Sequence, residues 1–378
     1  MVKAVTKTGT LGQLLYRLRE WRWPEALQSL LDDSMFVADA DIVAALQDTY
    51  GPFKCKLSTP DEYSDQLHKG ISKLIFFCRN GERTRVKKAK LLYPELEVFS
   101  ATYDLAGVSV GGGGYFEWEQ PKAEEAQKNP VVIIAPPGSD VEYFAETLRR
   151  NNVCDAREYV NRTVATWAAE QDDFSLLRFL QGVNKKHGRE QLQLILYTDV
   201  LEDLMRYTGF SFDRFLWLAK KSSVQVLFFT RRDKSTQSAL LAQLDEELGR
   251  SYWASGQLAQ ECINDPELRE DTADQFLNWL LRIEARIEQQ LAKLKKFKYL
   301  TLEETVESPV EVTEAIANYL GRPVDGEVEW PEYARPYKKR PNLVKFANNY
   351  RQALIDRLGL RMNEEGSYVS DAELITKN

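Results

Sequence analysis

The residues that most clearly suggest a chemical function lie in VVIIAPPGSDVEYFAETLRR, from Val131 to Arg150. It predicts a buried strand, a turn with Pro and Gly, and an amphipathic helix. Such a junction presents backbone N–H groups at a helix N-terminus, where phosphate or sulfate binds. Here the turn carries Asp140 and Glu142, and one carboxylate about 4 Å from a phosphate costs on the order of 4 kcal/mol at an effective dielectric constant near 20. The stretch therefore combines the architecture of an anion site with residues that repel anions.

Strands and helices alternate on both sides of this turn. Before it, KLIFFC (Lys73 to Cys78), RTRVKKAKLLYP and LEVFSATYDL predict a strand, a helix and a strand. After it, LQLILYT predicts a strand, and SSVQVLFFTRRDKSTQSALLAQLDEEL predicts a strand that feeds a helix. Residues 268–298 predict one long helix with a buried stripe made of Phe276, Leu280, Ile283, Ile287, Leu291 and Leu294. The helix VEVTEAIANYLG ends at Gly321. This order predicts the α/β class, with parallel sheets flanked by helices.

The domain boundary is expected at the segment PKAEEAQKNP. This segment, residues 121–130, is polar, bounded by prolines and almost free of bulky apolar side chains. A chain of 378 residues is long enough for two domains. We therefore predict a smaller N-terminal α/β domain over residues 1–120, a linker over 121–130 and a second domain over 131–378.

Composition excludes several classes of function. The formal net charge of -7 argues against nonspecific nucleic-acid binding. The four cysteines are scattered without a CxxC pair, and there are two histidines, so no metal site is expected and a reducing compartment is the default. The N-terminal stretch lacks the apolar core of a signal peptide, and no run approaches a membrane span. The expectation is a soluble cytoplasmic protein.

Residues 131–358, taken together, resemble the sulfotransferase superfamily, in its bacterial branch typified by trehalose 2-sulfotransferase. The resemblance rests on four pieces in the right order: ETLRRNNV followed by REYV, then VQVLFFTRRDKSTQSALL, then YLTLEETVESPVEVTEAIANYLG, and then ARPYKKRPNLVKFANNYRQAL. It implies a P-loop-like sulfotransferase fold. It also implies transfer of a sulfuryl group from 3'-phosphoadenosine 5'-phosphosulfate to a hydroxyl or amine.

The donor loop departs from the pattern of this family. Members place Arg or Lys and then Ser-Gly-Ser/Thr-Thr at the turn, so that a cation and hydroxyls meet the donor. In this sequence Ser139 matches the family pattern, but Gly138 occupies the position of the cation and Asp140 that of the glycine. The two positions that carry hydroxyl side chains in the family are Val141 and Glu142. An alternative interpretation of Glu142 is that it complements a helix N-terminus. In either case the sequence predicts that the anion is not bound.

The second phosphate site of the family is half preserved. Arg231 matches the Arg that holds the 3'-phosphate, whereas the Ser position falls on Leu240, with Ser238 two residues early. The alternative for Arg231 is a surface ion pair with Asp233 or another acid. A basic run lies at the position where a basic segment of family members closes over the nucleotide. The alternative is a charged surface exposed to solvent, which is the more common role of such a run. The run consists of Arg335, Lys338, Lys339 and Arg340.

Glu158, in the segment AREYV, matches the glutamate that this branch uses as the general base for the acceptor hydroxyl. A base acts only beside its donor site, so Glu158 gives little support by itself. The alternative is a carboxylate at a helix start or on the surface.

A second, local resemblance lies in FFCRNGERTRVKKAKLL. Cys78 followed by Arg83 and Thr84, between a strand and a helix, resembles the active loop of single-domain rhodaneses. The resemblance implies a reactive thiolate at Cys78 that Arg83 keeps ionised and that carries a persulfide. It covers about two dozen residues, and the upstream motifs of that family are missing. The alternative is a buried cysteine that ends a strand.

The N-terminal helix LLYRLREWRWPEALQSLL carries Trp21 and Trp23. Tryptophans of this kind often dominate protein interfaces, which suggests a protein partner. The alternative is that both side chains pack on their own domain.

Three hypotheses follow, and the first leans away from an enzyme. The chain is a sulfotransferase-fold protein that has lost donor binding and acts as a binding or assembly module without a cofactor. Alternatively, it is an active sulfotransferase that uses 3'-phosphoadenosine 5'-phosphosulfate, with Ser139, Arg231, Lys338, Lys339 and Arg340 binding the donor and Glu158 as base. In the third hypothesis it is a sulfur carrier through Cys78.

Overall fold

The structure is a computed structural model. It describes residues 30, 32–67, 70–104, 130–160, 162–171, 179, 193–208, 211–213, 216, 224–248, 269–294, 297–324, 326–332, 341–362 and 368–370. Three groups of predicted features lie outside the described residues: the partner-binding Trp21 and Trp23, the basic run with Lys338, Lys339 and Arg340, and almost the whole expected linker.

The chain divides into two compact units. The first contains Met1–Ile133, Ala156–Leu196 and Val200–Gln225, and the second contains Ile134–Asp155, Tyr197–Asp199 and Val226–Asn378. The predicted limits at residues 120 and 131 stay a prediction, because residues 105–129 are not described. Each unit is built on parallel strands with flanking helices, which confirms the predicted α/β class.

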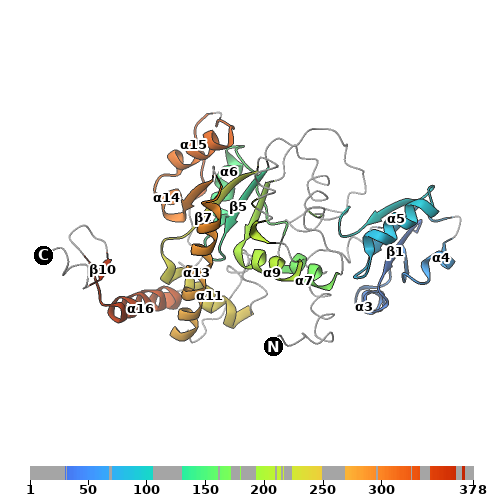
Figure 1. The fold of residues 1–378 in the computed structure, drawn as a ribbon, viewed down its shortest axis with the longest axis horizontal. Coiled ribbons are helices and arrows are strands. Elements are labelled where there is room, and N and C mark those ends of the chain that lie inside the picture. The colour runs from blue at the N-terminus through green and yellow to red at the C-terminus, as the bar shows by residue number, and fades with distance from the viewer. Residues whose placement is uncertain are drawn as a thin grey trace. The chain divides into compact units, whose positions relative to one another are not determined.

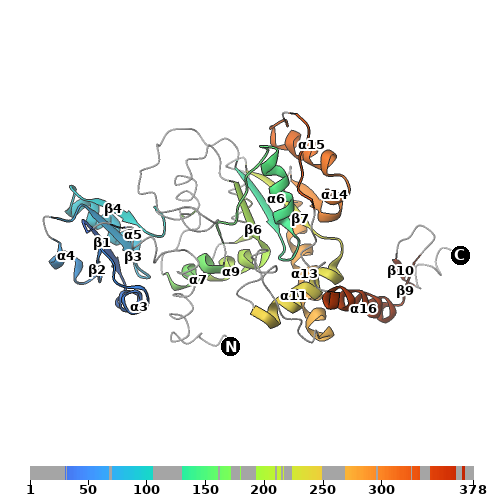
Figure 2. The same cartoon turned by 180° about the vertical axis from the view of Figure 1, so that it is seen from behind.

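The first sheet has four parallel strands in the order β2-β1-β3-β4 (Figures 1 and 2). Its strands β1 and β3 read SMFVA and KLIFF and are almost wholly buried, as expected of parallel strands covered on both faces. The elements of this region, in chain order, are β1 (Ser34–Ala38), α3 (Ala40–Tyr50), β2 (Lys56–Ser58), α4 (Tyr63–Gln66), β3 (Lys73–Phe77), α5 (Glu82–Leu92) and β4 (Glu97–Ser100).

A helix from much later in the chain completes the first unit. Trp167 of α7 (Arg162–Glu170) is 1% exposed and stacks on Phe77 of β3, with ring centroids 4.1 Å apart. On the opposite face of the sheet, Leu74 and Phe76 pack with Val86 of α5. The alternation of side chains along β3 therefore serves two cores, one against α5 and one against α7.

The second sheet has the strand order β6-β5-β7-β8, and β7 and β8 run parallel, with Leu227 opposite Lys298. Its strands and the helices around them (Figure 1) are β5 (Val131–Ala135), α6 (Val141–Arg150), β6 (Gln193–Tyr197), α9 (Thr198–Thr208), β7 (Gln225–Thr230), α11 (Lys234–Leu248), α13 (Glu270–Leu291), β8 (Lys298–Thr301), α14 (Leu302–Glu307) and α15 (Pro309–Leu320).

Helices α11, α13 and α16 (Pro341–Leu358) share one core. The helix predicted over residues 268–298 is observed as α13, which ends at Leu291. The five predicted stripe residues on α13 are buried, which confirms the periodicity, and the sixth, Leu294, is buried beyond the helix end. Gly321 ends α15 in the left-handed conformation (φ 68°), also as predicted. The C-terminal hairpin of β9 (Leu360–Met362) and β10 (Tyr368–Ser370) is antiparallel. Among the described helices, none is both long and apolar enough to cross a membrane.

Candidate functional site

The turn between β5 and α6 is held in a tight, packed conformation. Gly138 has φ +72°, and a Cβ at this position would meet the Gln237 side chain of α11 at 3.5 Å. Gln237 also donates a hydrogen bond from Nε2 to the Pro137 carbonyl at 2.8 Å. A glycine is favoured here by the left-handed backbone angle, whereas the 3.5 Å approach of Gln237 is an ordinary van der Waals contact. The turn therefore packs directly on α11.

Ser139, the one residue that keeps the family pattern in this turn, is fully buried. Its hydroxyl forms no hydrogen bond with any residue that the structure describes. The next residue, Asp140, adopts the left-handed conformation at φ 58°, which is uncommon for a residue other than glycine. The turn thus places a buried hydroxyl beside an acidic residue with an unfavourable backbone conformation.

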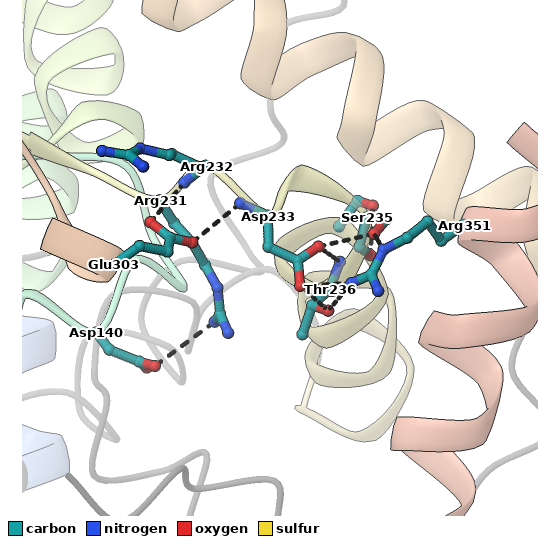
Figure 3. A network of polar contacts seen from close by, with 9 residues as sticks. Asp140, Arg231, Arg232, Asp233, Ser235, Thr236, Glu303 and Arg351 are labelled. Carbon is teal, nitrogen blue, oxygen red and sulfur yellow. Dashed lines mark hydrogen bonds and ion pairs between the residues drawn. The ribbon is translucent and has the colours of Figure 1, made fainter. Parts of the chain in front are cut away.

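Asp140 forms an ion pair with Arg231, the residue that follows β7 (Figure 3). One carboxylate oxygen, Oδ2, lies 3.5 Å from the guanidinium Nη1, and the two side chains are 14% and 4% exposed, respectively. Strands β5 and β7 are neighbours in the sheet, so their carboxyl ends bring the two residues together. The alternative role predicted for Arg231 was an ion pair with Asp233 or another acid, and Asp140 is such an acid, although the Arg231 side chain is buried and not on the surface. The predicted phosphate ligand thus meets a carboxylate of the donor turn itself.

The backbone after β7 is also occupied by a carboxylate. Glu303 of α14 accepts hydrogen bonds from the N–H groups of Arg232 at 2.9 Å and Asp233 at 3.1 Å (Figure 3). Such paired N–H groups are a common place for an anion to bind. Here the chain supplies the anion itself, since Glu303 fills this position.

Asp233 is the centre of a separate network at the start of α11 (Figure 3). It accepts from the Thr236 hydroxyl at 2.6 Å, from Ser235 at 2.8 Å and from Arg351 of α16 at 2.6 Å. Burial by itself would raise the pKa of Asp233, but the hydrogen bonds from Thr236, Ser235 and Arg351 outweigh it and lower the pKa to about 2. Asp233 therefore helps to hold α16 against the start of α11.

The remaining positions of the predicted donor site do not restore it. Leu240 is buried in the core of α11, and the Ser238 hydroxyl donates to the Ser235 carbonyl within the same helix at 3.0 Å. Glu142, in the first turn of α6, accepts a hydrogen bond from the Tyr197 hydroxyl at the end of β6. The contact of Glu142 with Tyr197 joins the start of α6 to the end of β6.

The predicted base, Glu158, is half-buried and belongs to the first unit, whereas the turn with Ser139 belongs to the second. Its role as a base stays a prediction.

The surroundings of Cys78 oppose ionisation. The thiol is fully buried at the end of β3 and lies 3.7 Å from the Val37 carbonyl. Burial raises the pKa of Cys78 strongly, and the nearby carboxylates of Glu82 and Asp39 raise it further. These carboxylates also accept the N–H groups of Cys78 and Arg79, both at 2.9 Å. The sulfur-carrier hypothesis requires a thiolate surrounded by N–H groups that are free to stabilise it. Here the N–H groups of Cys78 and Arg79 donate to carboxylates instead.

Two charged groups that sequence reasoning missed pair in the second unit: Glu284 is buried, and the Lys234 side chain is 17% exposed. Lys234, at the start of α11, donates to Glu284 of α13 and to the Thr230 hydroxyl, the latter at 2.7 Å. Burial lowers the pKa of Lys234 and raises the pKa of Glu284, while their mutual attraction acts against both shifts. Nothing in the local sequence signals this pair, because Glu284 is one of several acids along α13 and its neighbours in sequence do not reveal its burial.

Comparison with known proteins identifies no family. No family model matches the chain, and no curated protein matches it. Among solved structures, the chain is similar to the crystal structure of mouse sulfotransferase SULT7A1 complexed with PAP, with 13% sequence identity and a TM-score of 0.30. The match covers 60% of this chain and 66% of that chain, just under two thirds of its length.

Proposed function

We propose that this chain is a sulfotransferase-fold protein that has lost sulfate-donor binding and acts as a binding or assembly module for a protein partner. The observation that carries the proposal is the ion pair of Asp140 with Arg231 at 3.5 Å. Arg231, the cation of the predicted donor site that matches the family pattern, is paired with a carboxylate from the turn that would hold the donor. A nucleotide phosphate would have to displace this carboxylate and then stay near it.

Two further contacts support the loss of donor binding. Glu303 accepts hydrogen bonds from the two N–H groups after β7, and Glu142 accepts one from the Tyr197 hydroxyl. Each acid near the donor adds a repulsion of up to about 4 kcal/mol for unit charges about 4 Å apart at an effective dielectric constant near 20. Such a repulsion lowers affinity by roughly three orders of magnitude.

Calorimetric titration of the purified chain with 3'-phosphoadenosine 5'-phosphate tests the proposal directly. We expect no binding at millimolar nucleotide, both in the wild type and in Arg231→Ala. Micromolar binding by the wild type that is lost in Arg231→Ala would contradict the proposal and restore the active-sulfotransferase alternative. In that case Glu158→Ala is the next variant to measure, since the alternative requires it to abolish sulfate transfer.

A further inference from the structure

Glu82, the first residue of α5, is a fully buried carboxylate inside the first unit. Its Oε1 accepts hydrogen bonds from the Ser100 hydroxyl and from the Thr102 N–H, the latter at 3.0 Å. Its Oε2 accepts from the Cys78 N–H at 2.9 Å and from the Thr102 hydroxyl at 3.0 Å. The donors come from the end of β3, from β4 and from the turn after β4. Glu82 therefore joins the carboxyl ends of both strands to α5.

The Thr102 hydroxyl connects the hydrogen bonds of Glu82 to α7 and the residue that follows it. Besides donating to Glu82, its oxygen accepts from Trp167 Nε1 at 2.8 Å and from Gln171 Nε2 at 3.1 Å. A hydroxyl has one donor and two acceptor positions, so these three bonds use them all. The orientation of the Thr102 hydroxyl thus depends both on the Glu82 carboxyl group and on the Trp167 and Gln171 side chains.

Helix α7 closes the network against water. Trp167 is 1% exposed and stacks on Phe77, the residue before Cys78. Just beyond the end of α7, Gln171 is also buried, and its Oε1 accepts from the Tyr103 hydroxyl at 3.4 Å. Undocking of α7 would remove the two side chains that cover Thr102 and would admit water towards Glu82.

The protonation of Glu82 responds to this enclosure. Burial raises the pKa of Glu82 to about 7, although the hydrogen bonds from Ser100, Cys78 and Thr102 act in the opposite direction. The α7 side contributes the neutral side chains Trp167 and Gln171. Among the side chains that the structure describes, the charged groups around the network are Asp39 after β1, Asp104 after β4, Arg79 in the β3–α5 turn and Arg85 on α5.

We propose that Glu82 makes the docking of α7 on the first sheet dependent on pH, with the neutral carboxyl favouring the closed network and the ionised carboxylate loosening α7. The neutral form can donate to the Ser100 oxygen, which already accepts from the Tyr103 N–H and has a second acceptor position. The ionised form is better solvated when α7 moves away, because water then reaches it.

The direction follows from proton linkage. A carboxyl group whose pKa is about 7 in the closed state and near the ordinary 4.5 when hydrated binds its proton more tightly in the closed state. Docking of α7 is therefore strongest at low pH and weakens by up to about tenfold per pH unit between these two values. Above about pH 7 the carboxylate is ionised in both states, and the dependence levels off.

Hydrogen exchange of residues 162–171 in the full-length chain, measured from pH 5.5 to 8.5 and corrected for the intrinsic exchange rate, tests the proposal. We expect the protection of α7 to fall by roughly an order of magnitude up to about pH 7 and then to stay constant. Glu82→Gln should remove the pH dependence, and Glu95→Gln, at an exposed position before β4, should behave like the wild type. A wild type with constant protection, or a Glu82→Gln variant that keeps the slope, would overturn the proposal.

A second variant keeps the test decisive if Glu82→Gln does not fold. Trp167→Phe retains a ring that can stack on Phe77 but removes the Nε1 donor to Thr102. We expect α7 protection several-fold lower than in the wild type at every pH, with the pH slope retained. Unchanged protection in Trp167→Phe would show that Thr102 does not hold α7, and the proposal would be wrong.

Discussion

The Asp140 carboxylate and the Arg231 guanidinium lie 3.5 Å apart at the carboxyl ends of two neighbouring strands. Both side chains are largely buried, and Asp140 adopts a left-handed conformation to reach this place. The pair converts the predicted phosphate ligand into one half of an internal ion pair.

Asp140→Asn should partly reopen the anion site. The change removes the negative charge but keeps a side chain that tolerates the left-handed backbone. We expect affinity for 3'-phosphoadenosine 5'-phosphate to rise at least about tenfold over the wild type, since removing one repulsion of a few kcal/mol more than suffices. Isothermal titration calorimetry measures this change.

A matched control for this prediction is Asp41→Asn. Asp41 also pairs with an arginine, Arg79 at 2.8 Å, but it lies in the first unit and is half exposed. The control should leave nucleotide affinity unchanged. Equal affinities of Asp140→Asn and the wild type would mean that the Asp140 charge does not block the site.

Lys234→Met should destabilise the protein by about 3–5 kcal/mol, because it leaves the Glu284 carboxylate buried without its cation. Adding Glu284→Leu should recover most of the loss, since two apolar side chains replace the buried ion pair. Urea denaturation of the single and double variants measures both effects. As a control, Arg269→Met breaks an ion pair with Asp271 whose side chains are 67% and 58% exposed, so it should cost less than about 1 kcal/mol. A double variant less stable than the single one would show that the pair is not the source of the loss.

Trp167→Ala should cost about 3–5 kcal/mol of unfolding free energy, because it empties a fully buried site against Phe77 and leaves the Thr102 oxygen with one donor fewer. Trp330→Ala is the control, since that side chain is 46% exposed, and it should change stability by no more than about 0.5 kcal/mol. Thermal or chemical denaturation gives both values. Similar losses in the two variants would argue that α7 is not part of the core of the first unit.

The Cys78 thiol should be inert in the native protein at neutral pH. Burial and the adjacent carboxylates raise its pKa, so the reactive thiolate is scarce and also inaccessible. Alkylation with iodoacetamide at pH 7, followed by mass mapping, should leave Cys78 unmodified until the chain is unfolded in guanidinium chloride. Fast modification in the native state, or loss of thiosulfate:cyanide transfer in Cys78→Ser, would revive the sulfur-carrier hypothesis.

Local sequence was sufficient for features that depend on short-range physics. The stripe from Phe276 to Leu294 repeats at helical spacing, so it predicts a buried helix face without knowledge of what covers it. Gly321 was predicted as a helix end because a left-handed residue there favours glycine. The apolar runs of β3, β5 and β7 likewise predicted buried parallel strands.

Only the tertiary structure decided which charges meet. The sequence placed Asp140 and Arg231 in the predicted donor site, but the pairing of one with the other depends on strand order and on side-chain direction, which no local pattern encodes. The same holds for Glu82, which looks like an ordinary acid at a helix start but is buried and accepts hydrogen bonds from residues at the ends of β3 and β4. Periodicity and backbone preference act over a few residues, whereas the desolvation of a charge depends on everything the fold packs around it.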